Sequence, residues 1–155
     1  MDRRDVSSWL SGPKETLEQQ GIEFGYLGER LGFPETGIGS VSRPGRRLIA
    51  LTIDWFASLF IANAFGSNLS NNAHSWLVLN VFAVQILLLT IFTGSSFGQR
   101  ILGIGVRRLD EQRLDILGVV VRTLLLLLVI PAVVYDRDGR GLHDKAVGSV
   151  VLRIR

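Results

Sequence analysis

The sequence predicts a mainly α-helical integral membrane bundle with a small cytoplasmic β-pair. Two apolar runs, 48–65 and 76–92, are each long enough for a helix that crosses a bilayer core of about 30 Å. A third apolar run, 116–135, contains an arginine and a proline and is predicted to span or to re-enter. Two short segments with alternating β-branched residues, 104–109 and 146–155, are typical of strands.

The chain is predicted to divide into a polar cytoplasmic N-terminal arm, 1–45, and a membrane domain, 46–155. The arm mixes acidic and basic residues, and Pro13 suits the first turn of a short helix. We expect no independent core there. Two interpretations of its apolar side chains stay open: they dock on a partner or on the membrane surface, or they belong to a loosely ordered tail. These side chains are Trp9, Leu10, Phe24, Tyr26, Leu27, Leu31 and Phe33.

Charge predicts the orientation in the membrane. The loop 66–75 contains no Lys or Arg, whereas the segments before the first run and after the second are rich in Arg. The positive-inside rule therefore places the N-terminus in the cytoplasm of a multi-pass plasma-membrane protein. The net charge of +3 comes from basic residues spread over several loops, so no nucleic-acid partner is expected. The chain has no cysteine, which excludes disulfides and thiol chemistry.

The third apolar run allows two topologies. A full span would place the C-terminus outside and separate the two predicted strands, although neither strand can satisfy its backbone alone. A re-entrant or interfacial segment would keep both strands in the cytoplasm, with Arg122 reaching the headgroups and Pro131 supplying the break. We favour the second topology, although a run of about 20 residues is enough for a span.

Asp54 lies inside the first apolar run, and a carboxylate at membrane depth is costly unless it has a partner. Arg47 precedes it by seven residues, which places both on nearly the same helix face with a rise of about 10.5 Å. That separation is too large for a direct ion pair unless Arg47 reaches inward. A second cation would complete the site, with three candidates: Arg100, Arg122 and Lys145. Asn80 and Gln85 could form hydrogen bonds between the spans.

Three roles for Asp54 stay open: a buried architectural charge neutralised by one Arg, a titrating proton or cation site, and support for an interface. No catalytic residue is expected. His143 and Asp144 are neighbours in sequence, and adjacent side chains rarely face each other. Because the chain has only two histidines, we do not expect a histidine metal site. The acidic segment 136–139 resembles the start of a calcium loop but lacks the rest of it. We expect no metal and no cofactor.

Three motifs in order resemble one family. The segment from Arg47 to Asp54, RLIALTID, resembles the first motif of the RDD family of small membrane proteins. GQRILGIGV at 98–106 and GRGLHDKAVGSVVL at 139–152 are similar to two later motifs of that family. The resemblance covers roughly residues 44–155 and implies that Arg47, Asp54 and Asp144 are the Arg and the two Asp for which the family is named. It departs at Gln99, where a Lys is usual, and at 147–149, where AGT is usual. The third apolar run is also short.

The resemblance implies a multi-pass membrane domain without settled biochemistry. Our first hypothesis is a non-enzymatic accessory or scaffold subunit of a larger membrane complex. The alternative is an oligomeric cation or proton transporter that uses Asp54. The expected partners are the lipid bilayer and either other membrane-protein subunits or further copies of this chain. The supporting polar residues are predicted to be Arg100, Arg122, His143, Asn80 and Gln85. The Gly- and Arg-rich style of the sequence resembles actinobacterial proteins.

Overall fold

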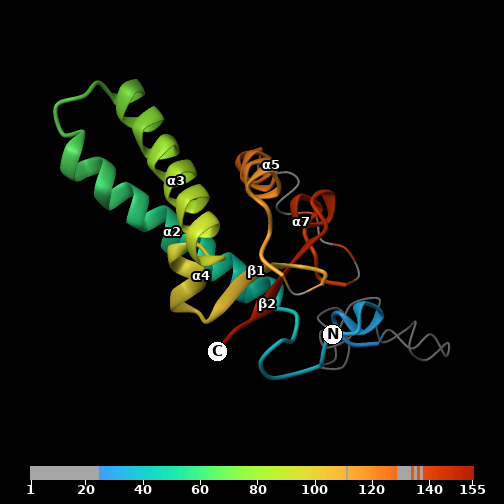
Figure 1. Cartoon of the computed structure of the whole chain (residues 1–155). Helices are drawn as coiled ribbons and strands as arrows, with labels where there is room; N and C mark the ends of the chain where they lie inside the picture. Colours follow the sequence, from blue (N-terminus) through green and yellow to red (C-terminus); the bar gives the residue numbers. More distant parts are fainter. Residues whose placement is uncertain (1–24, 111, 129–133, 135, 137) are drawn as a thin grey trace, which may run out of the picture.

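Two long helices form a hairpin in the computed structural model, which describes residues 25–110, 112–128, 134, 136 and 138–155 (Figure 1). Helix α2 (Pro44–Phe65) has 22 residues and α3 (Asn71–Thr93) has 23. At 1.5 Å per residue each is about 33 Å long, enough for a bilayer core. Both are also apolar enough to span. These two spans confirm the predicted fold class.

Local signals set the ends of the hairpin helices. Pro44 occupies the first turn of α2, where its missing N–H costs nothing. Ser70 precedes α3, and its hydroxyl accepts a hydrogen bond from the amide of Ala73. Gly94 ends α3 in a left-handed conformation (φ 74°), which glycine adopts without steric cost.

A small polar base lies at one end of the hairpin, as Figure 1 shows. It contains α4 (Phe97–Ile101), β1 (Ile104–Arg108), α7 (Leu142–Ala146) and β2 (Ser149–Arg153). Strands β1 and β2 pair antiparallel with Val106 opposite Val151, which confirms the predicted β-pair. The segment before α2 lies against this two-stranded sheet, because Val41 forms an isolated bridge with Leu152 of β2. The start of α2, the end of α3 and the C-terminal strand therefore share one end of the molecule.

The third apolar run begins with a helix, and residues 129–133 and 135 of the run lie outside the described residues. Helix α5 (Ile116–Leu127) has 12 residues, about 18 Å, which is too short for a span. It lies beside the half of the hairpin nearest the base and packs Leu126 against Phe82 and Ile86 of α3 (Figure 1). Because β2 pairs with β1, the described segments before α5 and after it meet at one end of the hairpin, as in the re-entrant alternative. The predicted break at Pro131 lies outside the described residues.

The described part of the N-terminal arm packs on the sheet. A short 3-10 helix, η1 (Glu29–Leu31), precedes Phe33, which is buried. Phe33 and Val41 form a core cluster with Val150 and Leu152 of β2, and Leu27 and Leu31 pack against it. Phe33 is thus an internal contact of the chain rather than a docking group. The predicted helix at Pro13 and the apolar residues Trp9, Leu10 and Phe24 lie outside the described residues, and the division at residue 46 stays a prediction.

Candidate functional site

Asp144 lies at the centre of a buried ion-pair network beneath the hairpin. One of its carboxylate oxygens accepts from Nη1 of Arg47 on α2 at 3.0 Å, and the other accepts from Nε of Arg122 on α5 at 2.7 Å. Asp144 itself is fully buried, and both arginines are less than 10% exposed. Three elements far apart in sequence therefore meet at one carboxylate. We call these three residues the Arg–Asp–Arg triad.

The triad fixes the charge state of Asp144. Burial alone would raise the pKa of its carboxyl, but the guanidinium of Arg122, and next that of Arg47, reverse this effect and hold the pKa below its ordinary value. Arg47 also donates from Nη2 to the carbonyl of Val151 on β2 at 3.3 Å. The triad thus joins α2 to α5, α7 and the sheet. Breaking a buried pair of this kind typically costs about 3–5 kcal/mol.

Asp54 is buried about two turns further along the same face of α2 and contacts no cation among the described residues. One carboxylate oxygen accepts from the hydroxyl of Ser96, and the other accepts from the backbone amide of Gly98 at 2.8 Å. Both donors belong to the start of α4. The expectation that an arginine neutralises Asp54 was wrong. The amides at a helix start carry partial positive charge and take the place of the cation.

Close packing of α4 on α2 makes this contact possible. A Cβ at Gly98 would lie 2.1 Å from the backbone oxygen of Ala50, so only glycine fits there. Ser96 and Gln99 form a capping box, in which each side chain bonds the backbone of the other residue. The sequence does contain a signal for this helix start, S-x-x-Q at 96–99, but we made no prediction from it. Ser96 and Gly98 were therefore missed as partners of Asp54.

The other predicted polar residues divide into two groups. Gln85 of α3 joins the hairpin helices, because its amide donates to the carbonyl of Asp54 at 2.7 Å and to the hydroxyl of Ser58 at 3.0 Å. Asn80 only donates to the carbonyl of Trp76 within α3 and is exposed. Arg100 is exposed at the base, where its carbonyl accepts from Arg155. Neither Asn80 nor Arg100 is part of the buried networks.

His143 lies closer to Asp144 than its position in the sequence suggested. Its Nε2 atom is 3.5 Å from the Asp144 carboxylate, and the hydroxyl of Ser149 lies 3.3 Å from the same oxygen. The expectation that neighbours on the chain would face apart was wrong here. Asp144 and Ser149 have no exposed surface, and His143 has little. Within the described residues no group of His, Cys, Asp and Glu could hold a metal ion.

A third acidic residue, Asp136, pairs with two cations beside α7. Asp136 lies 3.7 Å from Nη2 of Arg140 and 3.3 Å from Nζ of Lys145. The backbone amide of Asp138, and next Lys145, lower the pKa of the Asp136 carboxyl. Lys145 is thus an exposed partner of Asp136 and does not reach Asp54.

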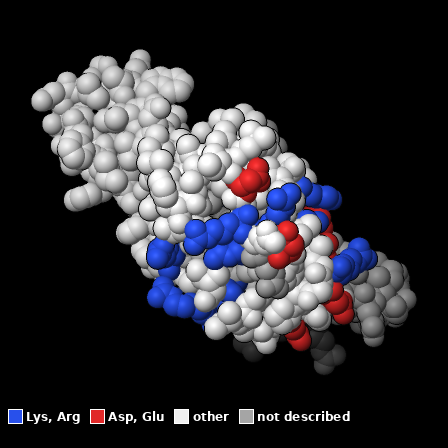
Figure 2. Space-filling view, in the orientation of Figure 1, with Lys and Arg blue, Asp and Glu red and all other residues white. Residues whose placement is uncertain are grey.

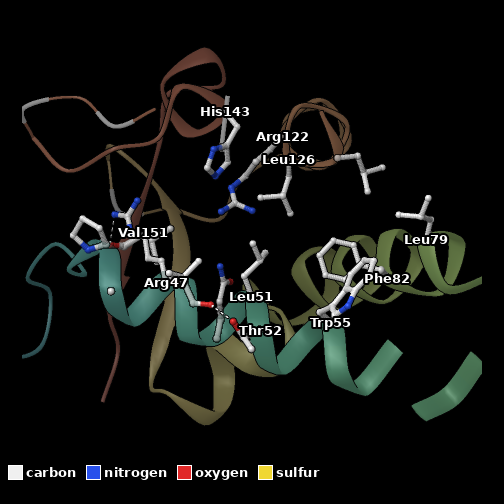
Figure 3. A pocket seen from close by; sticks show the side chains of 15 residues that line it. Arg47, Leu51, Thr52, Trp55, Leu79, Phe82, Arg122, Leu126, His143 and Val151 are labelled. Atoms are coloured by element: carbon white, nitrogen blue, oxygen red, sulfur yellow. Dashed lines mark hydrogen bonds between the residues drawn. The ribbon is translucent and has the colours of Figure 1, made fainter. Parts of the chain in front are cut away.

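A cavity of about 530 Å³ opens between α2, α3, α5 and α7 (Figure 3). One end is polar and includes Arg47, Arg122 and His143. The other end is apolar and includes Trp55 and Phe82, whose rings meet edge-to-face with centroids 5.4 Å apart. The described lining contains no acidic residue. The two arginines of the triad therefore line the polar end of an amphipathic chamber.

The model of the RDD family matches residues 41–148, which contain Asp54, Asp144 and the two arginines of the triad. The chain belongs to the RDD family. The match confirms the resemblance seen in the three sequence motifs. No curated protein and no solved structure matches this RDD protein significantly.

In this RDD protein the three family charges belong to two separate networks. Arg47 and Asp144 meet directly, whereas Asp54, about two turns further along α2, contacts α4. Arg122, which the sequence analysis named as a supporting residue and as one candidate cation for Asp54, is instead the second cation of the triad around Asp144. The two long apolar helices and the family agree on a membrane protein.

Proposed function

We propose that this RDD protein is a non-enzymatic accessory or scaffold subunit of a larger membrane complex. The supporting observation is that the chain itself supplies donors to both family carboxylates. Asp144 is held by two arginines, and Asp54 is held by the start of α4. Within the described residues, each oxygen of both carboxylates already accepts at least one hydrogen bond from the chain. The family charges then serve to hold the polar base against the hairpin.

The surface of the membrane helices supports a protein that works with partners. In the apolar window of each span only 22% of the residues are buried inside the chain. Large apolar side chains such as Phe56, Phe60 and Phe92 are more than 60% exposed. These faces require lipid or other membrane helices around them. Two spans and a short third helix form a thin bundle with little room for a closed pathway.

The polar base provides the second surface that we assign to partners. Basic side chains gather over the base, whereas the distant half of the hairpin carries none on the face shown in Figure 2. Exposed arginines include Arg100, Arg108, Arg113, Arg153 and Arg155. We propose that the base and the N-terminus face the cytoplasm of a plasma membrane and that the loop 66–75 lies outside.

The buried cluster of His143, Asp144 and Ser149 does not suggest an enzyme to us. The residue types are those of a hydrolase triad, but a nucleophile must reach its substrate. Ser149 has no exposed surface, and its hydroxyl lies against the carbonyl and carboxylate of Asp144. We therefore assign the cluster to the architecture of the base.

A second candidate function is oligomeric transport of a cation or proton through Asp54. The polar group formed by Asp54, Ser58 and Gln85 inside the hairpin favours it, because polar residues at membrane depth often mark ion pathways. The hydrogen bond that each oxygen of Asp54 already accepts from α4 weighs against it. Asp54→Asn in vesicles with an imposed pH gradient separates the two. A transporter loses flux while folding survives, whereas a scaffold shows no flux above empty vesicles for either chain.

The direct test of the accessory role is gentle detergent extraction of a C-terminally tagged chain from native membranes, followed by mass spectrometry. We expect a stoichiometric membrane-protein partner. A deletion that ends at Phe24 keeps Phe33 and Val41, which pack on the sheet, and so tests the arm without removing this core. Purification of the chain alone, with proton or cation flux in vesicles, would contradict the accessory role.

A further inference from the structure

We propose that the cavity between α2, α3, α5 and α7 binds one anionic phospholipid of the surrounding bilayer. Its phosphate would lie at the polar end, and one acyl chain would fill the apolar end. The volume of about 530 Å³ lies in the range of roughly 300–1,000 Å³ that is typical of small-molecule sites. It accommodates one chain and part of a headgroup rather than a whole lipid.

Charge at the polar end selects an anion. Two guanidinium groups share the single carboxylate of Asp144, so the triad carries an excess of one positive charge. Arg122 is 3% exposed and uses Nε for Asp144. In the part of the chain that the structure describes, no acceptor bonds its two Nη atoms. Figure 3 shows this guanidinium extending from α5 toward α2, beside the ring of His143. A phosphate oxygen would satisfy these donors with charge-assisted hydrogen bonds.

The apolar end has the character of an acyl-chain site. Leu51, Trp55, Phe82, Leu126 and Leu127 line it. Trp55 and Phe82 hold each other edge-to-face, which keeps this wall in place. On α2 the lining residues recur at helical spacing from Arg47 through Leu51 to Trp55, so one helix face leads from the charge to the apolar end. This is the order of headgroup and chain in a lipid.

Depth in the membrane agrees with a bilayer lipid as the occupant. Arg47 lies near the start of α2, next to the polar base, and Trp55 lies about two turns further along the span. A phosphate at Arg122 would thus lie near the headgroup level and its chain in the hydrocarbon. A water-soluble phosphate compound would leave the apolar end empty.

Fluorescence of Trp55 provides the test, because this residue lines the cavity. The chain has three tryptophans, and Trp9→Phe with Trp76→Phe leaves Trp55 alone. The full chain is placed in vesicles that contain either phosphatidylglycerol or phosphatidylcholine brominated on the acyl chains. We expect saturable quenching with about fivefold preference for phosphatidylglycerol, the factor that one basic group near a membrane surface supplies. Equal quenching by both lipids would overturn the proposal.

Two matched variants place the effect in the cavity. Thr52→Phe fills the lining between Leu51 and Trp55 without touching the triad, whereas Ile49→Phe adds similar bulk to α2 outside the lining. We expect Thr52→Phe to abolish the preference for phosphatidylglycerol and Ile49→Phe to keep it. Preference that survives in Thr52→Phe would show generic lipid contact and would overturn the site.

Discussion

Asp144 is the residue through which α2 and α5 are both joined to α7. Its two oxygens each bond one arginine, and those arginines come from α2 and α5. A buried guanidinium without its carboxylate is an uncompensated charge, which is far more costly than a lost surface pair. The stability of the base should therefore depend on the charge of Asp144 more than on its size.

The lowered pKa of Asp144 leads to a pH prediction. A carboxyl whose pKa is lower in the folded state stabilises the fold above its unfolded pKa of about 3.9 and loses this contribution as the pH falls through the folded value. We expect the gap in unfolding midpoint between the wild type and Asp144→Asn, measured in detergent, to narrow below about pH 4. Exposed Asp115→Asn is the matched control and should show no such gap. A gap that stays constant from about pH 7 to strongly acidic pH would contradict the ion-pair role.

Asp54 shows how far a single residue could be understood from the sequence. Its position in an apolar run correctly indicated a buried carboxylate that needs partners. The partners were predicted to be cations on other segments, but they are Ser96 and the amide of Gly98. The amide donor of Gly98 belongs to the backbone, so the type of residue at that position does not predict the contact. The approach of α4 to α2 depends on tertiary packing and is invisible in a list of charges.

At the scale of elements, the contact between α4 and α2 depends on one glycine. Gly98→Ala would place a methyl group 2.1 Å from the carbonyl oxygen of Ala50, and a backbone atom can only give way if the helices separate. We expect a loss of about 1–3 kcal/mol of stability, as for other overpacked sites. Urea or thermal unfolding in detergent measures it.

Gly45→Ala is the control for that prediction. Gly45 also lies at the start of a helix, but a methyl group added there would meet no atom within 4 Å. Alanine there should leave stability unchanged or raise it by up to about 1 kcal/mol. Equal effects of the two substitutions would show that helix propensity, rather than the approach of α4 to α2, decides the outcome.

The elements themselves were largely readable from the sequence. Hydropathy identified both spans, and alternation identified the strands and their pairing. The third apolar run was harder, because a run of about 20 apolar residues fits both a span and a shorter helix. Its helix ends at Leu127, and the pairing of β2 with β1 decides the side to which the chain returns. Strand pairing between distant segments is a tertiary fact that hydropathy does not contain.

For the whole molecule, the shared sheet makes a topological prediction. Strand β2 pairs with β1 and is bridged by Val41, so the segments before α2 and after α5 must be on one side of the membrane. The chain has no cysteine, which allows single cysteines to be introduced at Thr36, Ser67 and Lys145. We expect a membrane-impermeant maleimide to label only Ser67→Cys in intact cells, and all three after permeabilisation. Labelling of Lys145→Cys together with Ser67→Cys in intact cells would contradict the re-entrant third segment.

For the whole molecule, our central hypothesis is that the ion pairs of the triad hold the base to the hairpin. The decisive measurement is the free energy of unfolding in detergent for the wild type, for Asp144→Asn, and for the apolar replacement of all three residues by Arg47→Met, Asp144→Leu and Arg122→Met. We expect Asp144→Asn to lose about 3–5 kcal/mol, and the triple variant to recover most of that loss because no buried charge is left unpaired. An Asp144→Asn chain as stable as the wild type would show that the carboxylate does not hold the base to the hairpin.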